Sequence, residues 1–208
     1  MFESVSRLAL AVQCGLLLDE LQYQAGRYAS IEVLQSAQTL GLVFSQKLVQ
    51  GAARSGLVNK LQWLVQQRHT GTALQHAVAA DAASSGSVEM IQWLRSQYVY
   101  FTNQALRIAA VGNHLPLAQY LRSIDTPWHA DMAVQVAEKG HLDMLKWLSC
   151  QECPMNHSSV AVSAARWGHL HILKWLTIEH GVNLVNSKAL AEAARGGHVP
   201  VMNWLIAQ

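Results

Sequence analysis

The sequence has little charge, few cysteines and no long apolar run. Only 13% of its 208 residues are charged, and the formal net charge of +2 is too small to indicate nucleic-acid binding by itself. Three cysteines are too few for the disulfide framework of a small secreted domain, and they fit a reducing compartment. No run reaches the roughly 18 apolar residues of a membrane span. We therefore expect an intracellular protein, in the cytoplasm, with no membrane association.

The motifs of common enzyme classes are also missing. The sequence contains neither a phosphate-binding G-x-x-x-x-G-K-[ST] motif nor a strand-linked G-x-G-x-x-G motif. No Ser/His/Asp arrangement and no pair of carboxylates can be assigned a catalytic role. Four of the ten histidines recur at one repeat position, where we expect them to hydrogen-bond the neighbouring backbone. We predict no enzymatic activity, no catalytic residue and no cofactor.

The N-terminal stretch LALAVQCGLLL, residues 8–18, has the length of a signal-peptide core. The preceding MFESVSR carries one acid and one base, and no small-residue cleavage site follows. We therefore favour a buried capping helix over a signal peptide.

What the sequence does contain is a repeat. GHLDMLKWL at 140–148 returns as GHLHILKWL at 168–176 and as GHVPVMNWL at 197–205. Weaker copies are ASIEVLQSA at 29–37, GLVNKLQWL at 56–64, GSVEMIQWL at 86–94 and NHLPLAQYL at 113–121. Successive copies start 27 to 30 residues apart, a period that indicates stacked supersecondary units.

Each copy predicts two helices joined by a tight turn. A block of small residues precedes the copy, and its second small residue is, in order, Gly26, Ala53, Ala83, Ala110, Ala137, Ala165 and Ala194. Glycine, or Asn113 in one copy, then occupies a position that suits a left-handed helix cap. Pro116 and Pro200 share a position just beyond it, and proline is accepted in a helix only in the first turn.

One helix pair cannot bury its apolar face, but seven stacked pairs can. We therefore predict an all-α helical repeat solenoid of about seven pairs, in a single array over residues 1–208. Residues 1–24 form the N-terminal cap and first helix. The repeat cores lie near 25–37, 52–64, 82–94, 109–121, 136–148, 164–176 and 193–205.

At AEKGHLDMLKWL and AARWGHLHILKWL the sequence resembles the ankyrin repeat, whose helix pair follows A-A-x-x-G-H-L-E-x-V-x-x-L-L. The resemblance spans roughly residues 25–208. The repeats are short, averaging about 28 residues against the usual 33, and T-P-L-H has only a weak echo in TALQH at 72–76. The resemblance thus implies a protein-binding scaffold with shortened fingers and little or no β-structure.

The segment KWLSCQECPMNH raises a metal or redox alternative. Cys150, Cys153 and His157 have a spacing close to that of zinc ligands, and Cys-x-x-Cys also occurs in redox motifs. A tetrahedral zinc site needs a fourth ligand, and redox motifs of this kind lie in a βαβ setting. Ser123 and Thr126 occupy the equivalent positions of the previous copy. We therefore favour a helix end and a loop turn, with no metal.

A candidate partner surface combines tryptophan with arginine. A regular aromatic column predicts a packing ladder between second helices; it comprises Trp63, Trp93, Tyr120, Trp147, Trp175 and Trp204. Trp128 and Trp167 have no counterpart in this column, and we expect no repeat equivalent for either. The resemblance implies that fingers and first-helix ends form a concave binding face. We predict a partner surface at Trp128, Trp167, Arg166, Arg195, Arg54, Glu138 and Lys139.

The arginines of this surface belong to a second column, which reads Arg27, Arg54, Ser84, Val111, Glu138, Arg166 and Arg195. Such a column is either a solvated edge or a contact surface. The functional prediction is a monomeric, non-catalytic scaffold or adaptor that binds another protein on its concave face. Two alternatives remain: a nucleic-acid binder that uses the arginine column, and a metal or redox protein that uses Cys150 and Cys153.

Overall fold

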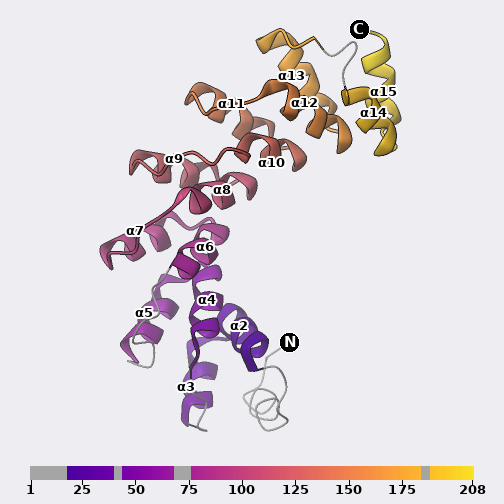
Figure 1. Cartoon of the computed structure of the whole chain (residues 1–208). Coiled ribbons are helices and arrows are strands. Elements are labelled where there is room, and N and C mark those ends of the chain that lie inside the picture. The colour runs from indigo at the N-terminus through magenta and orange to yellow at the C-terminus, as the bar shows by residue number, and fades with distance from the viewer. Residues whose placement is uncertain (1–17, 40–43, 68–75, 184–187) are drawn as a thin grey trace. The chain divides into compact units, whose positions relative to one another are not determined.

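The computed structural model describes residues 18–39, 44–67, 76–183 and 188–208. Within these residues the chain forms fourteen helices and no strand, which confirms the prediction of an all-α protein (Figure 1). None of the described helices is long and apolar enough to cross a membrane. Most of the N-terminal apolar stretch and of TALQH lies outside the described residues, so those two predictions are not addressed.

The helices alternate as first and second members of seven pairs. The first helices are α2 (Leu18–Tyr28), α4 (Gln46–Arg54), α6 (His76–Ser85), α8 (Asn103–Val111), α10 (Met132–Glu138), α12 (His157–Arg166) and α14 (Lys188–Arg195). The second helices are α3 (Ile31–Thr39), α5 (Val58–Gln66), α7 (Val88–Ser96), α9 (Leu115–Ser123), α11 (Leu142–Cys150), α13 (Leu170–His180) and α15 (Val199–Ile206).

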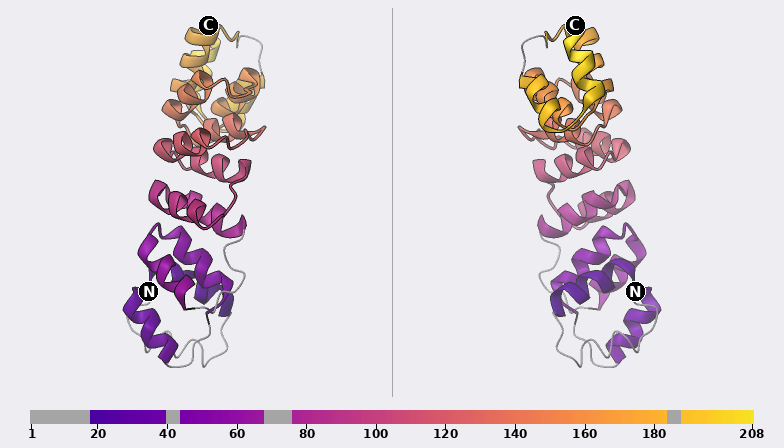
Figure 2. Two further views of the ribbon diagram at one scale, coloured as in Figure 1. Left: turned by 90° about the vertical axis from the view of Figure 1, so that its left-hand side faces the viewer. Right: turned by 90° about the vertical axis from the view of Figure 1, so that its right-hand side faces the viewer.

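The chain divides into two compact units. Unit 1 comprises residues 1–108 and 116–126, and unit 2 comprises residues 109–115 and 127–208. In unit 1 α4 packs against both α2 and α6, and in unit 2 α12 packs against both α10 and α14. In unit 1 α5 packs against α4 and α7 against α6, and in unit 2 α11, α13 and α15 pack against α10, α12 and α14, the first helices of their own pairs (Figure 2). A single continuous array over residues 1–208 stays a prediction.

The predicted left-handed turns are confirmed. Gly56, Gly86, Gly140, Gly168 and Gly197 have φ between +73° and +79°, and Asn113 has φ +60°. Schellman-type hydrogen bonds close these turns, as where His169 N–H donates to the carbonyl of Ala164 at 2.8 Å. Pro116 and Pro200 each lie at the second residue of a helix, as expected for the first turn.

A second series of left-handed residues ends the second helices. Tyr98, Asp125 and Glu152 have φ between +55° and +60°, and Gly181 has φ +61°. The following residue closes the turn, as where Cys153 N–H donates to the carbonyl of Leu148 at 3.0 Å. The sequence did not indicate this series, because Tyr, Asp, Glu and Gly have no chemical property in common that would mark the position.

Two tryptophans of the aromatic column meet an aromatic residue from the loop before their own helix pair. Trp147 meets Trp128 edge-to-face at a centroid distance of 6.1 Å, and Trp63 meets Phe44 in the same way at 5.8 Å. Trp128 lies twelve residues before Gly140, and Phe44 lies twelve residues before Gly56. Trp128 therefore has a repeat equivalent, contrary to expectation. The loop before each of these pairs supplies an aromatic residue that covers the second-helix tryptophan.

Candidate functional site

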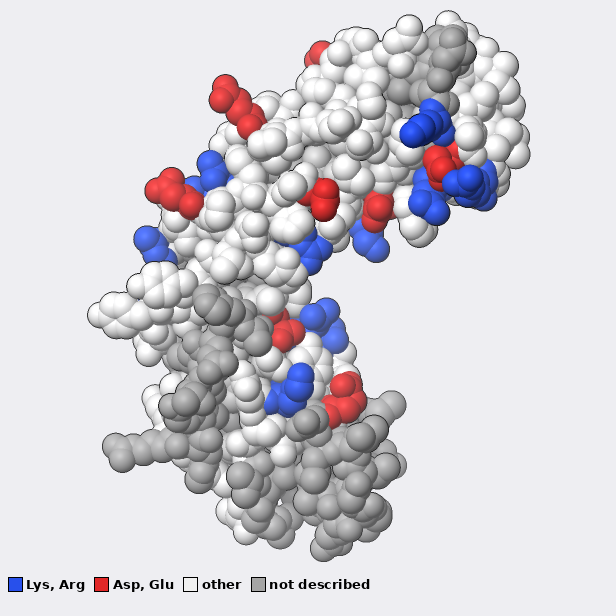
Figure 3. All heavy atoms as spheres, viewed as in Figure 1, with Lys and Arg blue, Asp and Glu red and all other residues white. Residues whose placement is uncertain are grey.

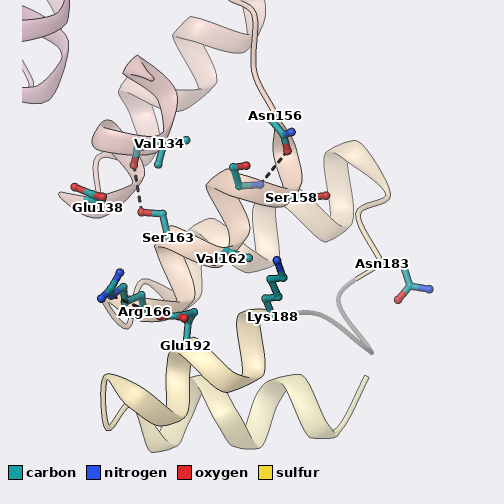
Figure 4. Close-up of a pocket in the computed structure, with 11 residues that line it drawn as sticks. Val134, Glu138, Asn156, Ser158, Val162, Ser163, Arg166, Asn183, Lys188 and Glu192 are labelled. Carbon is teal, nitrogen blue, oxygen red and sulfur yellow. Dashed lines mark hydrogen bonds and ion pairs between the residues drawn. The ribbon is translucent and has the colours of Figure 1, made fainter. Parts of the chain in front are cut away.

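The first helices of unit 2 line an open groove. α10, α12 and α14 are consecutive neighbours, and each of them buries small alanine side chains, such as Ala137, Ala161 and Ala193. The groove encloses about 660 Å³ (Figure 4). Its lining residues are Val134, Glu138, Asn156, Ser158, Ser159, Val162, Ser163, Arg166, Asn183, Lys188 and Glu192.

Hydroxyl and amide groups make up much of this lining. The Ser163 hydroxyl donates to the carbonyl of Val134 at 3.3 Å, which ties α12 to α10. Asn156 caps α12, since its Oδ1 accepts a hydrogen bond from Ser159 N–H at 3.0 Å (Figure 4). Ser158 and Ser159 are exposed on the first turn of α12. The groove therefore offers polar groups of the kind that hydrogen-bond a peptide backbone.

The groove is lined by two cations and two carboxylates, and Arg195 next to it adds a third cation. Arg166 Nε lies 3.6 Å from Glu192 Oε2, and Arg195 pairs with the other oxygen of the same carboxylate. The two arginine side chains are 58% and 69% exposed, whereas Glu192 is 17% exposed. Lys188 adds a further cation, and Glu138 adds a second carboxylate. Figure 3 shows blue and red spheres gathered over the α12 and α14 region. One positive charge in this group has no compensating carboxylate.

The same ion pair occurs in unit 1. Arg54 Nη1 lies 3.5 Å from Asp81 Oδ1, and the Tyr23 hydroxyl donates to that oxygen at 2.9 Å. Burial raises the pKa of Tyr23, and the hydrogen bond to Asp81 acts in the same direction. Asp81 and Glu192 both lie two residues before the second small residue of their copies. Part of the arginine column is thus matched by an acidic column, which sequence reasoning missed.

The structure places the predicted partner residues at four locations. Arg166, Arg195 and Glu138 belong to the groove region, with Trp167 next to Arg166 at the end of α12 and 55% exposed. Lys139 is exposed at the end of α10. Arg54 lies in unit 1. Trp128 is half-buried against Trp147 on α11, so its packing explains its presence. A role of these residues in binding stays a prediction.

Two of the four recurring histidines, His169 and His198, have the backbone-bonding role that was expected. His169 Nε2 donates to the carbonyl of Glu138 at 2.9 Å, and His198 Nε2 donates to that of Arg166 at 3.0 Å. Each ring thereby satisfies a carbonyl at the end of the preceding first helix. Each ring also lies against a turn glycine: a Cβ on Gly140 would be 2.7 Å from the His169 ring, and one on Gly168 would be 2.6 Å from the His198 ring.

The cysteines are located where a helix end and a loop turn were expected. Cys150 is exposed, Cys153 is buried, and neither is in a disulfide. Cys153 occupies the turn position that Val99 and Thr126 occupy in earlier copies, and both of those are also buried. Over the described residues, no group of three or more His, Cys, Asp or Glu side chains is arranged to hold a metal ion. His157 instead stacks on His180 at a centroid distance of 4.4 Å.

Comparison with protein-family models finds no match, and comparison with curated protein sequences finds no significant similarity. The groove, its charges and its exposed tryptophan are therefore the basis for a functional conclusion.

Proposed function

We propose that this protein is a non-catalytic scaffold that binds a segment of another protein in the groove of α10, α12 and α14. In this proposal the helix pairs form an ankyrin-like stack, and the groove belongs to its concave face. The protein acts as a monomeric adaptor, and Arg166, Arg195 and Trp167 are the main contact residues.

The observation that carries the proposal is the group of two arginines on one carboxylate beside an exposed tryptophan. Arginine and tryptophan are the residues most often found at the energetic centres of protein interfaces. Because Glu192 is shared, the guanidinium groups keep hydrogen-bonding capacity for a partner. The serine hydroxyls of α12 that line the groove supply complementary polar contacts.

Nucleic-acid binding has less support. A phosphate-binding surface needs cations that are free to replace counterions. Arg54 and Arg166 instead pair with acidic residues of the next copy, and those carboxylates would repel phosphate. Purified protein should therefore show no salt-dependent binding to mixed oligonucleotides.

Site-directed photo-cross-linking tests the proposed groove. A photo-reactive residue at Ser159 reports on the groove, and one at Lys174 on α13 serves as the control, since both positions are exposed in unit 2. In cells of the source organism we expect a discrete cross-linked protein partner from Ser159 and none from Lys174. The Arg166→Gln/Arg195→Gln variant should lose the cross-link while its circular dichroism is unchanged. Cross-linking from Lys174 alone, or a cross-link at Ser159 that survives both substitutions, would refute the proposal.

A further inference from the structure

Unit 1 carries an exposed aromatic loop that its own stability does not explain. Tyr98 and Tyr100 follow α7 and are 87% and 79% exposed, the highest values among the large hydrophobic residues described. Neither hydroxyl has a hydrogen-bond partner among the described residues. Two tyrosines in solvent contribute little to the core, so their presence calls for another reason.

The backbone conformation of Tyr98 is a second reason to expect a role in binding. Tyr98 has φ +60°, a left-handed conformation that is unfavourable for a bulky side chain. The equivalent turns at the ends of α9, α11 and α13 use Asp125, Glu152 and Gly181. Tyr98 therefore costs conformational free energy at a position where a small or acidic residue serves elsewhere in the chain. Residues held in such conformations cluster at binding sites.

The two tyrosines border a shallow pocket of about 350 Å³. Buried Val99 and Thr126 and half-buried Phe101 and Ile124 give it an apolar base. Arg95 is exposed at its edge, and no carboxylate of the described residues forms an ion pair with it. The pocket therefore combines an apolar depression, two aromatic rings and one uncompensated cation.

We propose that this pocket binds a segment of a partner protein that inserts one apolar side chain between Tyr98 and Tyr100 and places a carboxylate on Arg95. The tyrosines supply rigid contact area with a polar tip, and the guanidinium selects the acidic group by charge complementarity. This surface lies in unit 1 and shares no residue with the groove of unit 2. The inference can therefore be tested independently of the proposed function.

A displayed library of random twelve-residue peptides tests the proposal. Selection on the full-length protein, with depletion on the Tyr98→Asn/Tyr100→Ser variant, should enrich peptides that have Asp or Glu next to a large apolar residue. A synthetic peptide of that consensus should bind the wild type at least about tenfold more tightly than the Tyr98→Asn, Tyr100→Ser and Arg95→Gln variants. Arg95→Lys should retain part of the affinity because it keeps the charge.

Two controls separate binding from folding. Tyr28→Ser removes another exposed tyrosine of unit 1, 63% exposed and stacked on Arg27, and should leave peptide affinity unchanged. Tyr98→Asn should have a melting temperature equal to or above that of the wild type, because asparagine tolerates the left-handed conformation. Loss of affinity together with unchanged or raised stability is the signature of a binding residue.

Several outcomes would overturn the inference. They are the absence of enrichment over the double variant, a consensus without an acidic residue, and affinity that is insensitive to Arg95→Gln. Concentration-dependent self-association that disappears in Tyr98→Asn would show instead that the pocket binds a second copy of the chain. A lower melting temperature for Tyr98→Asn would show that the tyrosine stabilises the fold.

Discussion

The two units satisfy the same helix-end carbonyl in different ways. In unit 2 the rings of His169 and His198 donate to the carbonyls of Glu138 and Arg166. In unit 1 the equivalent carbonyl belongs to Arg27, and Lys60 Nζ donates to it at 3.4 Å and to that of Gly26 at 3.2 Å. Lys60 is only 3% exposed. It stands where the other copies have buried apolar residues such as Met90 and Met144.

The difference shows that a histidine ring and a lysine ammonium group can each donate to the carbonyl at this helix end. The second copy has Leu57 where copies four to seven have histidine, so no ring can reach back. A lysine one helical turn further on takes over, although burial of its ammonium group lowers the pKa of Lys60. Units 1 and 2 therefore both satisfy a carbonyl at this helix end and differ in the side chain that donates to it.

The largest loss of stability is expected when a side chain is added where α2 and α4 pack closely in unit 1. A Cβ on Gly26 would lie 2.0 Å from the carbonyl oxygen of Leu48, and one on Gly51 would lie 2.0 Å from that of Tyr23. Gly26→Ala or Gly51→Ala should cost about 3 kcal/mol or more, since the obstacle is backbone and cannot rotate away. Urea unfolding measures this cost. Unit 2 has Ala137 and Ala165 at the Gly26 position, so an unchanged midpoint for Gly26→Ala would mean that the two units pack alike.

Substitution of the turn glycines should be the next largest effect. Gly140→Val and Gly168→Val should each cost on the order of 1–2 kcal/mol or more, because a β-branched residue is poorly tolerated at positive φ. Chemical denaturation is again the measurement, and unchanged midpoints would mean that the turn is not left-handed.

Alanine at two of these turns isolates the histidine contact. Gly168 lies under the His198 ring, whereas a Cβ on Gly197 would meet nothing within 4 Å. Gly168→Ala should therefore be more destabilising than Gly197→Ala. Equal losses would show that the ring moves aside without cost.

Acid should weaken unit 2 more than unit 1. Burial lowers the pKa of His141 and of His157, and the neighbouring His180 contributes at His157. The unfolded chain then binds protons at a higher pH than the folded chain does. The folded state of unit 2 has its full stability above about pH 6.5. It loses stability as the pH falls from there toward the lowered pKa values of these two histidines.

Amide hydrogen exchange at pH 7.5 and 5.5 can test this difference. Protection should fall more in α10–α13 than in α4–α7 after correction for the intrinsic exchange rates. The His141→Asn/His157→Asn variant should reduce the pH dependence of unit 2. Equal acid sensitivity in both units would contradict the attribution of the pH dependence to His141 and His157.

A double-mutant cycle can transfer the unit 2 arrangement to unit 1. Lys60→Met removes the donor, and Leu57→His supplies a ring at the position used by the later copies. Leu57→His should change little alone, but in the Lys60→Met background it should restore about 1 kcal/mol through one hydrogen bond. Strictly additive free energies of unfolding would mean that the two donors do not serve one carbonyl.

The smallest effect is expected from the cysteines. Cys150→Ser/Cys153→Ser should remain within about 1 kcal/mol of the wild type, because serine and threonine occupy the equivalent positions of the preceding copy. Cys153→Thr should be milder still, since buried Thr126 already serves at that turn. Elemental analysis that finds stoichiometric zinc in the purified protein would contradict this expectation.

Much of the local structure could be predicted because it depends on neighbours in sequence. The glycine or asparagine after each first helix, the proline in a first turn and the spacing of apolar residues predicted helix pairs that the structure confirms. The role expected of the recurring histidines is confirmed for His169 and His198, since a residue that recurs at the turns of several copies is explained by the turn. The candidate site was predicted in part: Arg166, Arg195 and Glu138 come together, but their acidic partner Glu192 was missed.

The sequence by itself determined the helix pairs, the left-handed turns and the location of the cysteines at a helix end and a loop turn, because these follow from backbone sterics and from a pattern repeated along one chain. Only the tertiary structure decided which carbonyl Lys60 reaches, why Gly26 replaces alanine, and that Trp128 covers Trp147. It also decided that the left-handed residue after α7 is an exposed tyrosine. Such facts depend on distances between residues of different helices, which no local pattern encodes.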